Sequence, residues 1–221
     1  MPLIVLEGPE GAGKTTQIRM LAEWLGAAGK TVVAVREPGG TPLGDEIRRL
    51  LLDPASDPTP RSESLLFMAS RAQLIEREIQ PALASGAIVL VDRFFLSTYA
   101  YQVHGRGLPH EEISAANRLA TSSLRPDLTL LLALPVEEGL GRAGKRGPSD
   151  RMEQADGAFH ERVARAFEEF ARKEWQVAHP EAGPIVTVNA RGSVDEVFAR
   201  VLATLESRWP GTFASTTAQH R

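Results

Sequence analysis

The chain has 221 residues, of which 43% are hydrophobic and 24% are charged, so it suits one large domain and excludes a collagen, a coiled coil or a wholly disordered chain. Its net charge of −3 argues against sequence-blind nucleic-acid binding, which requires a strongly basic face. The absence of cysteine excludes disulfides, thiolate metal sites and cysteine nucleophiles.

Short apolar runs alternate with longer amphipathic stretches, which is the pattern of helices packed on a parallel sheet. We expect nearly continuously apolar strands, buried on both faces, at 3–6, 31–35, 88–91, 128–134 and 185–188. Helices are expected at 15–28, 43–52, 62–85, 111–123, 159–178 and 194–209. The prediction is an α/β fold, a doubly wound five-stranded parallel sheet with helices on both faces. The longest apolar run is too short to cross a bilayer, and we expect a cytoplasmic protein.

Two segments, 53–61 and 139–150, are rich in proline or glycine and are predicted to be loops. The second is locally positive, and together with the residues after it suits a lid over an anionic ligand at about 139–153. A solvated surface loop fits that segment equally well. We expect one domain over 1–209. Residues 210–221 are mostly small and polar without periodicity, which predicts a disordered tail.

The segment from Gly8 to Thr15 fits the P-loop pattern and lies between an apolar strand and an amphipathic helix. Its glycines let backbone N–H groups turn toward phosphate oxygens, and the following helix presents its positive dipole end at the same point. Lys14 is then expected at the β- and γ-phosphates, and the Thr15 hydroxyl on Mg²⁺. A glycine-rich turn without a ligand is the alternative. The residues expected to hold ATP are Gly8, Pro9, Glu10, Gly11, Ala12, Gly13, Lys14, Thr15 and Thr16.

Asp92 and Arg93 follow the third apolar run, and the carboxyl ends of parallel strands open onto the ligand crevice. Asp92 is expected to hold Mg²⁺ directly or through water, while Arg93 grips a phosphate. The alternative is a helix cap at Asp92 and a surface charge at Arg93.

The motifs that the sequence lacks reduce the set of possible acceptors for the phosphoryl group. Residues 188–192 read VNARG, without the Asn-Lys-x-Asp run of a GTPase, and protein-kinase signatures are absent. A phosphate monoester needs no catalytic base, because its oxygens are already ionised near neutral pH. Positioning and charge neutralisation by a P-loop, Mg²⁺ and an arginine-rich lid then suffice.

Over 3–206 the chain resembles bacterial thymidylate kinases. The motifs that carry the resemblance lie at 8–16, 36–41 (REPGGT), 66–71 (LFMASR), 92–102 (DRFFLSTYAYQ) and 150–153 (DRME). The resemblance implies phosphoryl transfer from ATP to dTMP, giving dTDP and ADP for dTTP biosynthesis, and a homodimer paired through helices that flank the sheet. A kinase for another deoxynucleoside monophosphate is one alternative, and a P-loop protein that binds ATP without transferring phosphate is another.

The resemblance also implies residue roles. Phe67 and Arg71 share a helix face at i and i+4, where the ring stacks on thymine and the guanidinium bonds its O4. A core phenyl ring with a snorkelling arginine is the alternative. Glu10 lies near the sugar 3′-hydroxyl, and Tyr101 crowds the ribose 2′ position. The full set of residues expected to bind dTMP is Glu10, Arg48, Phe67, Arg71, Arg93, Ser97, Thr98, Tyr101 and Gln102.

The catalytic arginine is expected in the lid. Eukaryotic members of the family that the chain resembles have an arginine in the P-loop where this chain has Gly11. Bacterial members without that arginine have the catalytic arginine in the lid, and this chain follows the second pattern. Arg142, Lys145, Arg146 and Arg151 are the candidates, with Arg146 and Arg151 preferred. The residues expected to be catalytic are Lys14, Arg93, Arg146 and Arg151.

Overall fold

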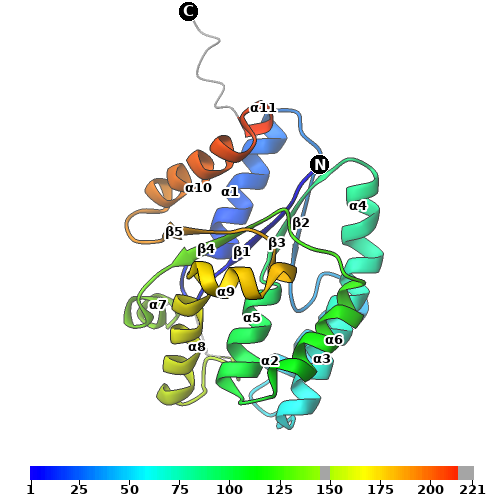
Figure 1. Cartoon of the computed structure of the whole chain (residues 1–221), viewed down its shortest axis with the longest axis vertical. Helices are drawn as coiled ribbons and strands as arrows, with labels where there is room; N and C mark the ends of the chain where they lie inside the picture. Colours follow the sequence, from blue (N-terminus) through cyan, green and yellow to red (C-terminus); the bar gives the residue numbers. More distant parts are fainter. Residues whose placement is uncertain (145–149, 214–221) are drawn as a thin grey trace, which may run out of the picture.

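A computed structural model describes residues 1–144 and 150–213. Its strands form one sheet in the order β2-β3-β1-β4-β5, and each neighbouring pair is parallel (Figure 1). The strands are β1 (Leu3–Glu7), β2 (Val32–Arg36), β3 (Ile88–Asp92), β4 (Leu128–Ala133) and β5 (Ile185–Asn189). Each starts and ends within one residue of its predicted bounds.

Alternate residues of the strands face two separate hydrophobic cores, as the two-residue period of a strand requires. Ile4 and Leu6 of β1 pack with α1 (Lys14–Ala27) and α10 (Val194–Arg208). Leu3 and Val5 belong to the core on the opposite face, where most of the other helices lie. Helices therefore cover both faces of a parallel sheet (Figure 1), and the predicted fold class is confirmed.

The helices between β2 and β5 complete the fold. They are α2 (Pro42–Leu52), α3 (Pro60–Leu74), α4 (Gln80–Ala84), α5 (Phe95–Thr98), α6 (His110–Thr121), α7 (Val136–Ala143), α8 (Gly157–Phe170) and α9 (Lys173–Ala178), with π-helical turns η1 (Ile75–Ile79) and η2 (Tyr99–Gly105) and a 3₁₀ turn η3 (Pro180–Ala182). Thr41 and Thr59 cap α2 and α3 and are each followed by proline, a residue favoured in the first turn. No helix of the described residues is long and apolar enough to span a membrane.

Two long predicted helices are interrupted. The helix expected at 62–85 contains the π-helical turn η1, and the one expected at 159–178 ends at Phe170 before α9 begins at Lys173. The segment after β3, for which no helix is predicted, forms α5 and then η2. Tyr101 and Gln102 lie on η2, and π-helical turns occur often at functional sites.

The predicted loop at 139–150 is wrong in its first part, because α7 continues to Ala143. Position 139 of this helix requires glycine, because the backbone of the P-loop comes too close to it for any side chain. A Cβ at Gly139 would lie 2.3 Å from the carbonyl oxygen of Glu10. Lys145 and Arg146 lie outside the described residues.

The predicted tail at 210–221 is also wrong in its first part. Pro210–Phe213 form a short helix, α11, and the Phe213 side chain is fully buried in the core with α1 and α10. Trp209 packs against Phe213, with ring centroids 5.8 Å apart. This one apolar anchor among small and polar residues gives no periodic pattern, so composition alone missed it.

Candidate active site

The P-loop connects β1 to α1 through a turn that requires glycine. Gly8, Gly11 and Gly13 have φ angles of 140°, 71° and 90°, in the range that other residues rarely adopt. A Cβ at Gly11 would lie only 2.0 Å from the carbonyl oxygen of Gly139 on α7. The loop and α7 therefore pack backbone against backbone, and this chain has no room for a P-loop side chain at position 11.

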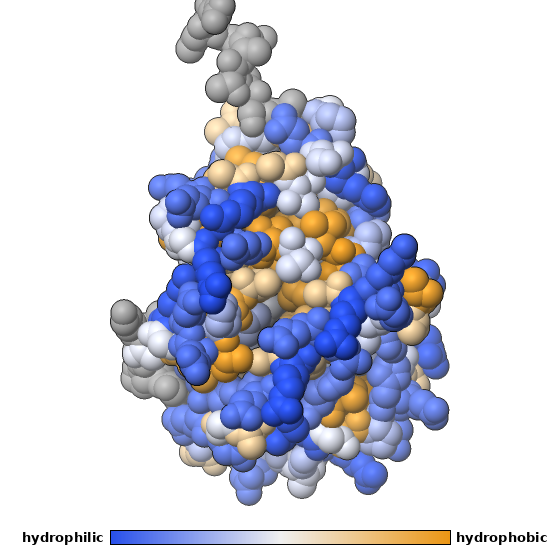
Figure 2. All heavy atoms as spheres, turned by 60° about the vertical axis from the view of Figure 1, so that its left-hand side comes forward, coloured by the Kyte–Doolittle hydropathy of each residue, from blue (hydrophilic) through white to orange (hydrophobic). Residues whose placement is uncertain are grey.

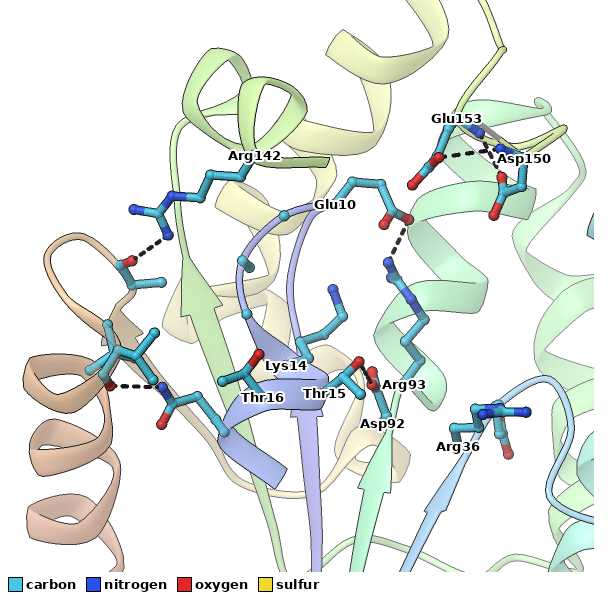
Figure 3. Close-up of a pocket in the computed structure, with 18 of the residues that line it drawn as sticks. Glu10, Lys14, Thr15, Thr16, Arg36, Asp92, Arg93, Arg142, Asp150 and Glu153 are labelled. Atoms are coloured by element: carbon cyan, nitrogen blue, oxygen red, sulfur yellow. Dashed lines mark hydrogen bonds and ion pairs between the residues drawn. The ribbon is translucent and has the colours of Figure 1, made fainter. Parts of the chain in front are cut away.

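Lys14 is buried beneath this loop. Its Nζ donates to the carbonyl oxygens of Gly8 and Pro9, at 2.9 and 2.8 Å. Burial, helped by repulsion from Arg93 and opposed by the attraction of nearby carboxylates, lowers the pKa of Lys14 to about 8. The amine points at the loop (Figure 3), where an anion would find a cation already stripped of water.

Thr15 and Asp92 meet at the base of the cleft. The Thr15 hydroxyl donates to Asp92 Oδ2 at 2.5 Å, across 77 residues of sequence (Figure 3). Asp92 ends β3, beside β1 in the sheet, so the strand order itself brings the two oxygens together. A hydroxyl and a carboxylate are hard oxygen donors of the kind that Mg²⁺ prefers. The residue types and their proximity fit the metal predicted from the sequence.

A cavity of about 380 Å³ lies over the P-loop and extends to the loop after β5. Arg142 on α7 donates to the carbonyl oxygen of Ala190 at 3.2 Å, so these residues form the far end of the cavity (Figure 3). Gly8 and Pro9 do not line the cavity but hold Lys14. The predicted residues that line it are Glu10, Gly11, Ala12, Gly13, Lys14, Thr15, Thr16, Arg48, Asp92, Arg93 and the lid candidate Arg142.

A second cavity, of about 120 Å³, adjoins the first and is lined by all nine residues predicted to bind dTMP. They come from the P-loop, α2, α3, the end of β3, α5 and η2. Phe67 is half-buried, so part of its ring faces the cavity. The remaining lining residues are Glu37, Leu52, Asp150 and Met152.

Arg93 stands where the two cavities join. Its guanidinium donates to Glu10 Oε1 at 2.5 Å and to the Ser97 hydroxyl at 3.0 Å. Tyr101 donates to the same Glu10 oxygen at 2.8 Å, and the Arg93 guanidinium lies 5.4 Å from the centre of its ring. Burial and the Glu10 carboxylate raise the pKa of Tyr101 well above its usual value, so its hydroxyl stays protonated.

Arg71 is almost completely buried, and the protein occupies all five of its N–H groups. They reach Glu37 twice, Thr98, Asn117 and the carbonyl oxygen of Phe94. Burial raises the pKa of the Glu37 carboxyl, and Arg71 opposes that shift. Arg71 thus lines the second cavity and also joins α3 to α5 and α6 through hydrogen bonds.

Arg151, predicted to be catalytic, is held away from the P-loop. Its guanidinium donates to the carbonyl oxygen of Leu51 at 2.8 Å and to Glu63 Oε2 at 2.6 Å. It lines neither of these cavities.

Several residues at the site were missed by the sequence analysis. Arg36 ends β2 and Glu37 follows it directly, and both line the cavity over the P-loop, although the sequence indicates them only as part of a motif. Glu7 accepts hydrogen bonds from the backbone N–H groups of Phe94 and Ser97 and from the Ser97 hydroxyl. The signal was available, because each of these charged residues closes an apolar strand at the carboxyl edge of the sheet.

A third cavity, of about 650 Å³, lies behind the P-loop between α7, α8 and the ends of β4 and β5. Leu131, Leu134 and Phe167 contribute to its apolar lining. Figure 2 shows that hydrophobic side chains gather at the centre of this side of the molecule, between hydrophilic borders. Of the predicted site residues, only Pro9 lines it.

Comparison with known proteins decides the family. The family model for thymidylate kinase matches residues 6–198. The chain belongs to the thymidylate kinase family. This membership confirms the predicted function, ATP-dependent phosphorylation of dTMP to dTDP.

Relatives in the family cover nearly the whole chain. The thymidylate kinase of Deinococcus radiodurans is 45% identical over 205 residues, which are 93% of this chain and 96% of the relative. That of Ectopseudomonas mendocina is 53% identical over 165 residues, 74% of this chain and 79% of the relative. The crystal structure of thymidylate kinase from Ehrlichia chaffeensis matches with a TM-score of 0.71 and 31% identity, covering 93% of this chain and 98% of that one.

Proposed function

We propose that the enzyme binds ATP and dTMP in one continuous cleft. The ATP phosphates lie in the cavity of about 380 Å³ over the P-loop, called the larger cavity below, and dTMP lies in the adjoining cavity of about 120 Å³, called the smaller cavity. The observation that carries this proposal is that the two cavities share residues. Glu10, Arg48 and Arg93 line both, together with Glu37 and Asp150. Two phosphate-bearing molecules bound on either side would therefore meet at Arg93.

On the donor side, the backbone N–H groups of residues 8–16 and the start of α1 hold the ATP phosphates. Lys14 exchanges its bonds to the two loop carbonyl groups for the β- and γ-phosphates. Thr15 and Asp92 hold Mg²⁺, which supplies charge neutralisation on the phosphates when it is bound. The nucleoside of ATP extends toward Arg142 and the loop at 190–194, where the larger cavity continues.

On the acceptor side, Phe67 stacks on thymine, and Thr98, Gln102 and Arg71 contact its polar edge. Arg71 has no uncommitted N–H group, so we propose that it shares the one that reaches the Thr98 hydroxyl, which can rotate. Arg48 and Arg93 grip the 5′-phosphate, with Ser97 orienting Arg93. Glu10 and Tyr101 enclose the sugar.

In the transfer, an oxygen of the dTMP phosphate forms a bond to the γ-phosphorus of ATP, and the bond from that phosphorus to the β,γ-bridging oxygen breaks. ADP leaves with the electron pair. Lys14 and Arg93 neutralise charge in this step, and a lid after α7 supplies a further arginine. We place Arg146 first in that role, because Arg151 would have to leave Glu63 to reach the phosphates.

We further propose a cytoplasmic homodimer. Four leucines are exposed on neighbouring helices: Leu43 (53%) and Leu50 (44%) on α2, Leu65 (64%) on α3 and Leu119 (85%) on α6. Helices α2, α3 and α6 pack in succession, so the leucines can form one apolar face for a second copy. Sedimentation of the wild type and of Leu65→Glu/Leu119→Glu tests this, because loss of the dimer is expected only in the variant.

The test of the proposed cleft is ADP production with dTMP, dUMP, dCMP and the ribose analogue of dTMP as acceptors. Phe67→Ala is expected to raise the KM for dTMP by about 10-fold or more, the cost of losing one stacked ring, while the KM for ATP stays within about twofold. Equal effects on both substrates would place the base elsewhere.

A further inference from the structure

Glu63 is a buried carboxylate to which the sequence analysis gives no role. It lies in the first turn of α3, one turn before Phe67, and its side chain is only 1% exposed. It lines neither the ATP cavity nor the dTMP cavity. A carboxylate buried to this degree needs several hydrogen bonds or ion pairs to remain ionised.

Four donors from three side chains surround this carboxylate. Oε1 accepts from Gln102 Nε2 at 3.2 Å and from Arg106 Nε at 3.1 Å. Oε2 accepts from Arg106 Nη2 at 3.0 Å and from Arg151 Nη2 at 2.6 Å. These donors fill the lone-pair sites of an ionised carboxylate, and the two-point grip of Arg106 fixes its plane.

The arrangement determines how the Gln102 amide is turned. An ionised carboxylate only accepts hydrogen bonds, so the NH₂ end of the amide has to face Glu63. The carbonyl oxygen is then the end left for the cavity, which Gln102 lines. Among the described residues, none donates a hydrogen bond to that oxygen.

We propose that Glu63 is a positioning residue for base selection, because it holds the Gln102 carbonyl oxygen toward N3 of the pyrimidine. The inference rests on the proposed binding of dTMP in the smaller cavity. N3 of thymine carries a hydrogen and can donate to this oxygen, whereas N3 of cytosine carries a lone pair and would face it unpaired. Such a site disfavours dCMP by leaving polar groups unsatisfied. Uracil has the same N3–H as thymine, so dUMP is not excluded by this contact.

Glu63→Gln tests the proposal because it reverses the expected orientation. The single carbonyl oxygen of the substituted side chain is drawn to Arg151 and Arg106, which leaves its NH₂ facing Gln102. Gln102 then turns its own carbonyl toward residue 63 and its NH₂ toward the base. We expect the ratio of kcat/KM for dTMP over dCMP to fall by about 10-fold or more, mainly through KM, with the dTMP to dUMP ratio unchanged.

Arg106→Lys is the matched control. It weakens the grip on the same carboxylate but leaves Glu63 an acceptor, so the Gln102 amide keeps its orientation. We expect a lower melting temperature and an unchanged dTMP to dCMP ratio. If Glu63→Gln also leaves that ratio unchanged, Glu63 has only a structural role and the proposal is wrong.

Two further measurements keep the result decisive. If Glu63→Gln does not fold, Glu63→Gln/Arg106→Gln keeps the local net charge and gives the same selectivity readout. In the wild type, the side-chain carbonyl ¹³C resonance of Gln102 should shift on adding dTMP or dUMP but not dCMP, and an equal response to all three overturns the proposal. Failure of the proposed cleft is separate, because Phe67→Ala would then leave the KM for dTMP unchanged.

Discussion

The two halves of the cleft are built from different parts of the polypeptide. The donor half is largely main chain: a strand, a glycine turn and a helix start, contiguous from Leu3 to Ala27. The acceptor half consists of side chains from the P-loop, α2, α3, β3, α5 and η2, joined by buried ion pairs. A backbone site depends on space and conformation, whereas a side-chain site depends on every polar partner being present.

The largest expected effect is the loss of turnover when Lys14, the buried cation of the donor half, is replaced. Lys14→Ala should lower kcat by about 10²-fold or more, comparable with removing a preorganised donor from a transition state. The melting temperature should stay near that of the wild type, because the amine contributes no apolar packing and carries a desolvation cost. Steady-state ADP release and thermal unfolding measure the two quantities, and wild-type turnover in the variant would remove Lys14 from the mechanism.

On the acceptor side, the corresponding change should lower stability as well as activity. Arg71→Met leaves Glu37 buried without its ion-pair partner, which costs about 3–5 kcal/mol in the free energy of unfolding. The exposed pair of Arg19 and Glu23 on α1 is the control, and Arg19→Met should cost no more than about 0.5 kcal/mol. Urea denaturation compares them, and equal costs would mean that the buried network is not what stabilises the acceptor half.

Two glycines on α7 test whether the P-loop needs the close backbone approach of this helix to keep its conformation. A Cβ at Gly139 would lie 2.3 Å from the Glu10 carbonyl oxygen, whereas one at Gly141 would meet no atom within 4 Å. We expect Gly139→Ala to displace the P-loop, raise the KM for ATP several-fold and destabilise the fold by about 1–3 kcal/mol.

Gly141→Ala is the matched control on the same helix. It should leave the KM for ATP unchanged and stabilise the fold by up to about 1 kcal/mol, since alanine favours a helix interior. If Gly139→Ala behaves in the same way, the close contact between α7 and the P-loop does not constrain the loop.

The same contrast explains what the sequence could predict. The conformation of the turn between β1 and α1 could be predicted, since it lies in one contiguous segment whose backbone conformation glycine reveals. The strands were predicted because buried parallel strands are continuously apolar. Glu63 was missed because its partners Gln102, Arg106 and Arg151 lie 39, 43 and 88 residues away, and no local pattern marks such contacts. Helix α7 was missed because Gly139 serves a close contact with Glu10 that only the fold creates.

The smallest expected effect is the uptake of a fraction of a proton by the enzyme when ATP binds. Burial lowers the pKa of Lys14 to about 8 in the free enzyme, and bound phosphates should raise it again. Because the bound-state pKa is the higher one, the contribution of Lys14 to ATP affinity is fully present below pH 8 and is lost as pH rises toward the bound-state value. At pH 8.5 about 0.7 of a proton should therefore be taken up with each ATP.

Calorimetry in two buffers of different ionisation enthalpy measures this uptake directly. ATP itself is fully ionised at pH 8.5, so the proton must come to the protein. Lys14→Arg is the matched control, since arginine stays charged and should take up no proton. Uptake that persists in Lys14→Arg would assign the proton to another group. It would also mean that the donor half does not hold its lysine poised near neutrality, which is the property that most separates it from the permanently charged arginines on the acceptor side.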